Sequence, residues 1–198
     1  MIESDIHPSV LRNHRPLGIV LERFIRPTST VLEIGAGDGG HLALLHDRLP
    51  FARWLATELP ERLPALAQRL AGLGDARIAA PRAYEAGADP VELGKFDVVL
   101  TVNTFHIMTS GALSHLIASL PARLQPGACF IVYGPFAVAG EHISPGNTEF
   151  DQALRERGTG QGIRDLDIVR QRAAAVGLVL AWKFAMPANN LVLVFRLA

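Results

Sequence analysis

A glycine-rich segment between two regular elements carries the clearest chemical signal in this sequence. Residues 31–40 read VLEIGAGDGG, an apolar stretch followed at once by glycines and then by a helical stretch. Glycine allows a backbone to turn tightly and to approach a bound molecule closely. Gly35, Gly37 and Gly40 have the spacing of the dinucleotide fingerprint. The spacing alone therefore leaves a nicotinamide cofactor, and an NAD(P)-dependent oxidoreductase, as one interpretation.

Two glutamates stand beside this loop. Glu33 lies in the stretch before it, and Glu58 directly follows the next predicted strand, at about the distance at which the dinucleotide fingerprint has an acidic residue for the ribose hydroxyls. A carboxylate at Glu33 suits a cationic group better than a pyrophosphate at a helix N-terminus. Neither tyrosine is followed four residues later by the lysine that short-chain reductases need. These residues favour S-adenosylmethionine, which has a ribose diol, an ammonium and a sulfonium.

The elements that must position these residues alternate between strand and helix. Helices are predicted over 11–25, 41–49, 61–73, 112–124 and 166–176, and strands over 30–34, 53–57, 77–80, 96–102, 129–133, 178–185 and 191–197. Alternation of this kind implies parallel strands with helical crossovers. The last two strands are separated by only five residues, which forces an antiparallel pair. We therefore expect a doubly wound α/β fold with a mostly parallel seven-stranded sheet and a C-terminal antiparallel hairpin.

The composition excludes several classes of partner. The chain has 198 residues, 19 basic and 19 acidic side chains and one cysteine, Cys129. We expect a single domain over 1–198, with a leading helical segment at 1–27. A balanced charge provides no field for nucleic acid or anionic lipid. The lone cysteine, and the absence of a signal-like or spanning apolar run, predict a cytoplasmic protein that binds neither nucleic acid nor membrane. The histidine spacing predicts no metal site.

Polar residues after the central strands are the candidates for catalysis. In an open α/β sheet, ligands bind outside the carboxyl ends of the strands. Asn103 and His106 follow the strand at 96–102, and Tyr133 ends the next strand. We expect Asn103 to contact the cofactor and His106 to be the first candidate for a general base, with a helix-start histidine as the alternative. Tyr133 is either a catalytic contact or the anchor of a turn.

Residues 134–147 are predicted to form a long substrate-side loop, because they are rich in glycine and proline and lack an apolar period. His142 on this segment is the second candidate base, and Ser144 and Asn147 are candidate substrate donors. Arg164 is a candidate for holding an anionic group, and Asp165 for capping the next helix.

The turn of the C-terminal hairpin contains two consecutive asparagines, Asn189 and Asn190. Asparagine tolerates positive φ, which explains both residues as parts of a turn. Their place at a strand end also makes Asn189 a candidate for binding substrate.

With these residues identified, the sequence resembles a class I S-adenosylmethionine-dependent methyltransferase family long catalogued as a domain of unknown function, whose vertebrate members are called methyltransferase-like proteins. The resemblance runs over the whole chain, through RN at 12–13, VLEIGAGDGGH, FDVVLTVNTFHI, YGPF, HISPGNTEFDQALR, GIRDLD and MPANNLVLVFR. The blocks YGPF and MPANNL are more specific than the glycine loop. The family fold includes a terminal hairpin inserted into the sheet, as expected from the residues.

The resemblance implies roles for the cofactor residues. Glu33, Gly35 and Gly37 correspond to the loop on the methionine side of S-adenosylmethionine. Glu58 corresponds to the carboxylate that binds ribose, although the family usually has an aspartate there.

The resemblance also implies two contacts at the ends of the cofactor. Glu85 falls where members have an aspartate facing the adenine amino group, and Asp89 is a competing candidate. Arg12 is placed to meet the cofactor carboxylate, with an exposed helix arginine as the alternative reading.

The expected function is in-line methyl transfer from S-adenosylmethionine to a small-molecule acceptor. A general base is needed only for an acceptor such as a hydroxyl or a protonated amine. A second hypothesis is an S-adenosylmethionine-binding module that transfers no methyl group or uses the cofactor for a different reaction. The NAD(P)-dependent oxidoreductase is the third.

Overall fold

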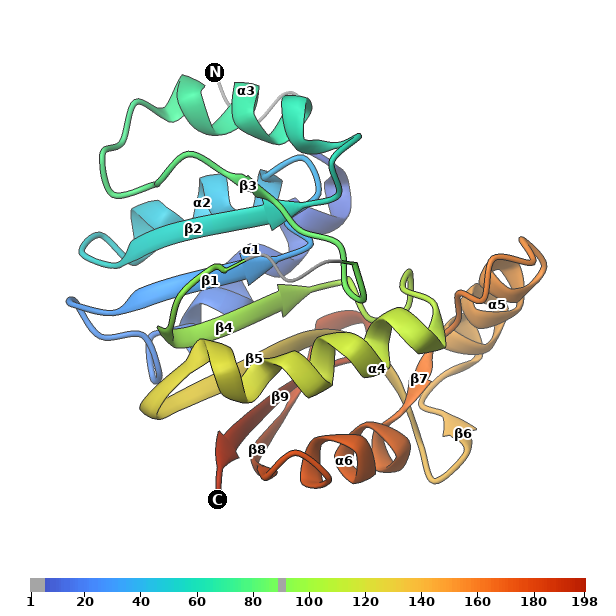
Figure 1. Cartoon of the computed structure of the whole chain (residues 1–198). Helices are drawn as coiled ribbons and strands as arrows, with labels where there is room; N and C mark the ends of the chain where they lie inside the picture. The colour runs from blue at the N-terminus through green and yellow to red at the C-terminus, as the bar shows by residue number, and fades with distance from the viewer. Residues whose placement is uncertain (1–5, 89–91) are drawn as a thin grey trace.

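A twisted sheet with helices on both faces forms the body of the computed structural model, which describes residues 6–88 and 92–198 (Figure 1). Its strands follow the order β3-β2-β1-β4-β5-β9-β8. Their bounds are β1 (Thr30–Ile34), β2 (Arg53–Glu58), β3 (Arg82–Ala83), β4 (Phe96–Val102), β5 (Leu124–Val138), β8 (Leu178–Met186) and β9 (Asn190–Leu197). Strands β1 to β5 pair in parallel, whereas β9 is antiparallel to both β5 and β8. The predicted fold class is confirmed.

The helices divide the core into two layers, one on each face of the sheet. Helices α1 (Pro8–Leu21), α2 (Gly40–Arg48) and α3 (Leu63–Leu73) contribute to one buried cluster, and α4 (Ser110–Ser119) and α6 (Leu166–Ala174) contribute to the other. Alternation along β4 shows the division, because Val98 and Leu100 belong to the first cluster and Val99 to the second. The sheet is therefore buried on both faces, and its strand ends remain available for a ligand.

The third strand lies later in the chain than predicted. Ile78, within the predicted strand 77–80, makes only an isolated bridge to Trp54, and the strand that pairs with the end of β2 is β3. The stretch at 77–80 has one strongly apolar β-branched residue, Ile78, and this weak pattern did not fix the register. Pairing of β3 with Glu58 brings the following residues to the carboxyl edge.

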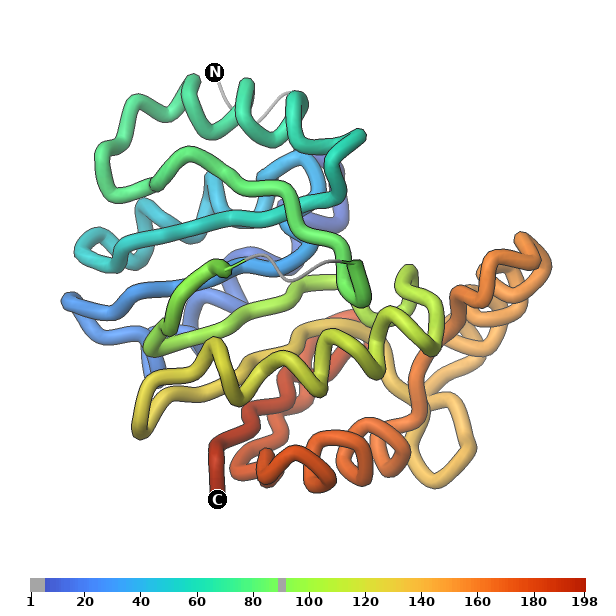
Figure 2. Tube along the Cα trace, viewed as in Figure 1, coloured from blue at the N-terminus to red at the C-terminus, as the bar shows by residue number. Residues whose placement is uncertain are grey.

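The prediction of a long loop over residues 134–147 is wrong. Strand β5 continues to Val138, a turn at Ala139 and Gly140 leads to β6 (Glu141–His142), and helix α5 (Pro145–Arg155) begins before 147. Gly134 and Pro135 read as loop residues, but Pro135 is the last β5 residue paired with β9. Figure 2 shows α5 standing out from the carboxyl edge of the sheet, with β7 (Arg164–Asp165) beside the end of β5.

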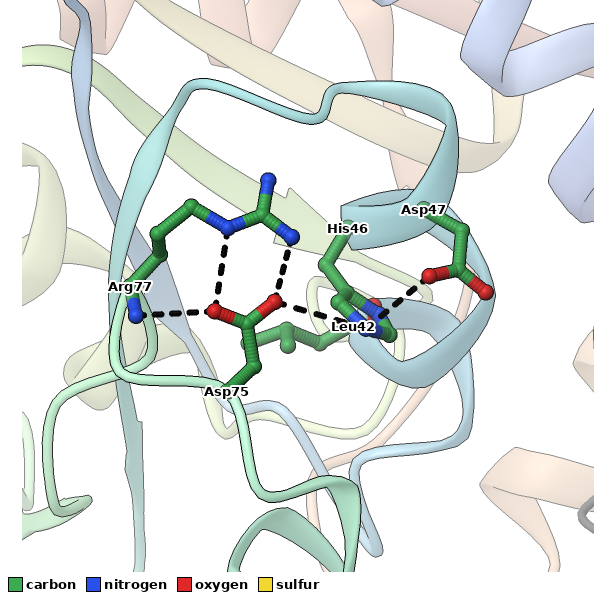
Figure 3. Close-up of polar contacts among 5 residues, drawn as sticks. All are labelled: Leu42, His46, Asp47, Asp75 and Arg77. Carbon is green, nitrogen blue, oxygen red and sulfur yellow. Dashed lines mark hydrogen bonds and ion pairs between the residues drawn. The ribbon is translucent and has the colours of Figure 1, made fainter.

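A polar cluster fastens the segment after α3 to the end of α2, away from the strand ends that could bind a ligand (Figure 3). Asp75 accepts hydrogen bonds from the backbone N–H and the guanidinium of Arg77. The Nε2 atom of His46 lies 3.2 Å from Asp47 Oδ1 and 3.9 Å from Asp75 Oδ2. Because Arg77 O accepts a hydrogen bond from Trp54 N near the start of β2, this cluster lies at the amino end of that strand.

Candidate active site

The glycine loop crosses the carboxyl ends of β1 and β2 in a fixed shape. The N–H groups of Gly35 and Ala36 both donate to Thr57 O at 3.0 Å. Gly35 has φ 71°, and a β-carbon there would lie 2.6 Å from Thr104 Cγ2, so the position admits only glycine. Gly37 has φ 62°, but no atom would lie within 4 Å of a β-carbon. Gly37 therefore presents bare backbone to open space, which suits a closely bound ligand.

Glu58 connects β2 to this loop. Its Oε2 accepts the N–H of Gly37 at 2.7 Å, and its Oε1 accepts the N–H of Leu59 at 2.9 Å. The residue is buried. Because an ionised carboxylate offers about four acceptor positions, two remain for further donors. The Glu58 side chain is thus fixed in place and still able to accept hydrogen bonds from a diol.

Glu33 is a buried carboxyl group with an unsatisfied oxygen. Its residue exposure is 1%, and Oε2 has no hydrogen-bond partner among the described residues. Burial, and secondarily the charge of Glu58, raise the pKa of Glu33 to about 8. Without a cation nearby the group is therefore protonated at neutral pH. A bound cation would favour the ionised form and supply the missing partner.

The leading helix offers a polar atom that the sequence interpretation did not select. Arg12 is exposed, whereas its neighbour Asn13 is 5% exposed and its Oδ1 has no hydrogen-bond partner among the described residues. The helical spacing could have identified Asn13, because it lies three residues after Val10 and four before Leu17 and so shares their buried face. Asn13 is therefore a buried polar group with acceptor capacity, and the contact of Arg12 with the cofactor stays a prediction.

The segment after β3 carries the predicted adenine contact. Tyr84 donates its backbone N–H to Glu58 O at 2.9 Å, which aligns this segment beside the end of β2. Glu85 follows with an exposed side chain. The competing candidate Asp89 lies outside the described residues.

Asn103 directly follows β4 and meets Tyr133, which lies inside β5 opposite Val102 and does not end its strand as predicted. Asn103 has φ 56° and donates its backbone N–H to Tyr133 O at 2.8 Å. Burial raises the pKa of Tyr133 to about 12, an effect that nearby Asn190 and the Arg12 charge partly oppose. The phenol oxygen is buried and makes no hydrogen bond of normal geometry with the described residues. Tyr133 therefore remains un-ionised and could donate a hydrogen bond to a ligand.

His106 lies next to these residues in a buried position. A β-carbon on Gly134 would lie 3.7 Å from Asn103 Oδ1 and 3.9 Å from His106 Nδ1, so both side chains flank that glycine. The imidazole meets the ring of Phe150 edge-on, with 5.3 Å between centroids. Burial, and secondarily the Arg164 charge, lower the pKa of His106 to about 4. The imidazole is therefore neutral at physiological pH.

Thr104 connects the His106 segment to the glycine loop, a role not anticipated from the sequence. Its hydroxyl lies 3.1 Å from Val102 O and 3.3 Å from Gly35 O. A threonine after a strand has no distinctive sequence signature, so only the tertiary structure identifies it. This contact fixes the relative placement of the two halves of the site.

His142 and Arg164 lie on a separate cavity of about 240 Å³, whose lining residues all fall between 110 and 172 and so exclude the glycine loop. His142 Nε2 lies 3.1 Å from Asp151 Oδ2. The Arg164 guanidinium donates to the carbonyls of Phe105, Met108 and Gly160. Arg164 thus supports the segment that carries His106, and the role of His142 as the second candidate base stays a prediction.

Three further candidates have structural contacts at α5 and the terminal hairpin. Ser144 caps α5 by accepting the N–H of Asn147 at 3.2 Å. Asn147 Nδ2 donates to Asn189 O at 3.2 Å, and Asn189 has the positive φ expected for its turn. Asp165 caps α6 as expected. Substrate contacts of Ser144, Asn147 and Asn189 stay predictions.

Within residues 6–88 and 92–198, no group of three or more His, Cys, Asp or Glu side chains is arranged to hold a metal ion. In the same part of the chain no helix combines the length and apolarity needed to cross a membrane. Burial raises the pKa of the Cys129 thiol to about 11. Cys129 is therefore a neutral core side chain rather than a nucleophile.

Several solved structures that this chain resembles are methyltransferases by name. The mitomycin 7-O-methyltransferase MmcR matches with a TM-score of 0.78 and 19% identity, over 93% of this chain and 54% of that one. An O-methyltransferase family 2 protein from Planctomyces limnophilus, in complex with apigenin, matches with a TM-score of 0.80 and 17% identity, over 95% and 58%. Human N-acetylserotonin methyltransferase, in complex with SAM, matches with a TM-score of 0.78 and 14% identity, over 92% and 51%.

The present chain thus spans about half the length of these structures, and at this identity the likeness establishes a Rossmann-like class I methyltransferase fold. The sequence itself matches a family profile over residues 4–197, almost its whole length. The chain belongs to the family described as "Protein of unknown function (DUF938)".

Proposed function

We propose that this protein is an S-adenosylmethionine-dependent methyltransferase that acts on a small-molecule acceptor. The observation that carries the proposal is the group formed by Glu33, Gly37 and Glu58 at the carboxyl ends of β1 and β2. It combines bare backbone facing open space, a buried carboxyl oxygen without a partner, and a fixed carboxylate with acceptor capacity. The names of structurally similar proteins support the same activity.

The donor set fits the chemistry of this cofactor. Glu58 would accept hydrogen bonds from the ribose diol through its two remaining acceptor positions. The buried oxygen of Glu33 would accept from the ammonium, and the two carboxylates would place negative charge near the sulfonium. A pyrophosphate on this loop would instead meet the acidic Glu33, which disfavours NAD(P). S-adenosylmethionine supplies an electrophilic methyl group whose thioether leaving group needs no proton.

The remaining task of the protein is to position the acceptor in a dry site. Tyr133 would orient it by a hydrogen bond, Asn103 would contact the cofactor, and the rings of His106 and Phe150 would exclude water. Because His106 is neutral at physiological pH, its imidazole is free to accept a proton from a hydroxyl or ammonium acceptor. With a pKa of about 4 it is a weak base, so it favours an acceptor that becomes acidic as the new bond forms.

Calorimetry with S-adenosylmethionine, S-adenosylhomocysteine and NADH tests the cofactor assignment. We expect saturable binding of the first two and none of NADH, with the affinity lowered about 10- to 100-fold in Glu58→Ala. Absence of S-adenosylmethionine binding at millimolar ligand, or preferential binding of NADH, would overturn the proposal. A screen of small acceptors for production of S-adenosylhomocysteine then separates the enzyme from a binding module, which would bind without turnover.

A further inference from the structure

The cavity of about 240 Å³ lies between α4, α6 and the β6–α5 segment, apart from the proposed cofactor site. Its volume corresponds to several water molecules, at about 30 Å³ each. Leu113, Ile163 and Val169 give it apolar walls, and the half-exposed Ile168 and exposed Arg155 mark its opening to solvent. A pocket of this kind can hold a small molecule with one polar group.

Three arginines converge on this cavity. Arg155 comes from α5, Arg164 from β7 and Arg172 from α6. Burial is the largest cause of the lowered pKa of Arg164, and the positive charges of Arg155 and Arg172 are the next causes. The three guanidinium groups therefore lie close together. Like charges held together destabilise the folded chain unless an anion compensates them.

The acidic residues of the cavity are already engaged. Asp151 accepts the N–H of Ile163 at 2.6 Å and Arg155 Nε at 2.7 Å. Asp165 caps α6 and accepts the N–H of Gly140 at 2.7 Å. Asp151 also pairs with Arg155, and the two carboxylates of the lining stand against three guanidinium groups, so one positive charge is left without a carboxylate.

The guanidinium groups retain donors that could reach a ligand. Arg155 uses only Nε, and Arg164 leaves Nη1 without a hydrogen-bond partner among the described residues. Arg172 donates from both Nη atoms to Ser110, at 3.3 Å to O and 3.0 Å to Oγ. A tetrahedral anion has enough acceptor positions to take bonds from several such donors.

One further atom at the cavity has no partner. His142 Nδ1 is buried and makes no hydrogen bond with the described residues, whereas Nε2 faces the Asp151 carboxylate. A carboxylate can only accept, which places the proton of a neutral imidazole on Nε2 and leaves Nδ1 as an acceptor. The missing group is therefore a hydrogen-bond donor on a ligand otherwise rich in acceptors. A phosphate group that retains one proton has both properties.

We propose that this cavity binds a phosphate group, either as inorganic phosphate or as the monoester of a small apolar molecule. The guanidinium groups of Arg155, Arg164 and Arg172 donate to its oxygens. The hydroxyl that inorganic hydrogen phosphate keeps at neutral pH, and that a monoester keeps below about pH 6, donates to His142 Nδ1. The apolar walls face the organic part of a monoester. The lining of this site holds no residue of the glycine loop, although Arg164 also contacts the segment that carries His106.

Titration of the full chain with inorganic phosphate, followed by amide NMR, tests the location. We expect the amide signals of Gly140 and Ile163 to shift with saturation, because their N–H groups bond to the carboxylates of the cavity. The signals of Gly37 and Gly39 in the glycine loop should stay in place. Absence of saturable shifts at Gly140 and Ile163, or shifts confined to the glycine loop, would overturn the proposal.

Variants and probe ions test the donors. Arg155→Met, an exposed position, should weaken phosphate binding at least about tenfold, and Arg172→Lys should weaken it less. Arg170→Met is the matched control on α6, since Arg170 pairs with Asp167 and is not a lining residue, and should leave the affinity unchanged. Equal effects of Arg155→Met and Arg170→Met would contradict the assignment.

Sulfate and an organic monoester complete the experiment. Sulfate has no proton at neutral pH to donate to His142 Nδ1, so it should bind more weakly than phosphate, and sulfate binding of equal strength would refute the His142 contact. Phenyl phosphate and inorganic phosphate are compared at about pH 6, where both keep a proton to donate, and tighter binding of phenyl phosphate would identify a monoester as the ligand. Equal affinities would identify the free ion.

Discussion

The carboxylate of Glu58 accepts a hydrogen bond from the backbone N–H of Gly37 at 2.7 Å, which joins two residues 21 positions apart at the edge of the sheet. This bond holds the glycine loop in its shape and fixes the carboxylate beside the open backbone of Gly37. The same side chain is therefore a support for the loop and the proposed ribose ligand.

Replacement of Glu58 should affect both roles. Glu58→Ala removes a charged acceptor from the Gly37 N–H, and we expect the Kd for S-adenosylmethionine to rise about 10- to 100-fold, since such bonds contribute about 1.5–3 kcal/mol. Calorimetry gives the affinity. The matched control is Glu61→Ala, an exposed carboxylate three residues later, which should leave the Kd unchanged. Similar losses in both variants would contradict the assigned role.

Gly37 in the glycine loop and Gly74 at the end of α3 form a matched pair that can distinguish a ligand contact from a requirement of the fold. Gly37 and Gly74 have φ of 62° and 64°, and neither has an atom within 4 Å of a β-carbon position. Alanine at either position should cost about 1 kcal/mol of unfolding free energy through backbone strain. Only Gly37→Ala should also abolish cofactor binding, because its β-carbon enters the proposed site. Urea unfolding and calorimetry on the two variants check this, and unimpaired binding by Gly37→Ala would count against the site.

Glu33 should make stability fall as pH rises. Its folded pKa of about 8 lies above the ordinary value of 4.5, so between these values the folded state binds a proton that the unfolded state does not. The contribution of the protonated group is complete below pH 4.5 and is lost as pH rises toward 8. We expect the unfolding free energy of Glu33→Gln minus that of wild type to increase by about 2–3 kcal/mol from pH 5.5 to pH 8. A difference that is independent of pH in urea unfolding would show that Glu33 is ionised throughout.

Binding of a cationic cofactor should release this proton. At pH 7 the Glu33 carboxyl is mostly protonated, and an ammonium beside it would favour the ionised form. Calorimetry in buffers of different ionisation enthalpy should therefore report release of up to one proton per S-adenosylmethionine bound. Glu33→Gln removes the titrating group and should show no such release. Equal proton release by the two proteins would assign the proton to another group.

His106 should titrate well below an ordinary histidine. Burial and the charge of Arg164 lower its pKa to about 4, so NMR of the imidazole protons should show a neutral ring down to pH 5. Because the folded state then binds fewer protons than the unfolded state, this residue lowers stability as pH falls from 6.5 toward 4. Arg164→Gln should raise the pKa, and Arg170→Gln should not. A pKa near 6.5 in wild type would contradict the buried environment.

The sequence by itself determined the fold class, the order of most elements and the position of the glycine loop. These follow from local signals, namely the alternation of apolar periods, the glycines at 35 and 37, and a C-terminal link too short for a crossover. Glu33 and Glu58 could also be selected, because each lies at a fixed offset from a predicted strand end.

Tertiary structure decided which polar groups are buried, partnered or open. Asn13 is buried and Arg12 is exposed because the two neighbours point in different directions from α1. Glu33 is protonated because packing removes water from its carboxyl group. The reading of 134–147 as a loop failed because pairing with β9 and the capped start of α5 override the loop preference of glycine and proline. Residues far apart in sequence, such as His142, Asp151 and Arg172, come together at one cavity only through long-range packing, which no local pattern encodes.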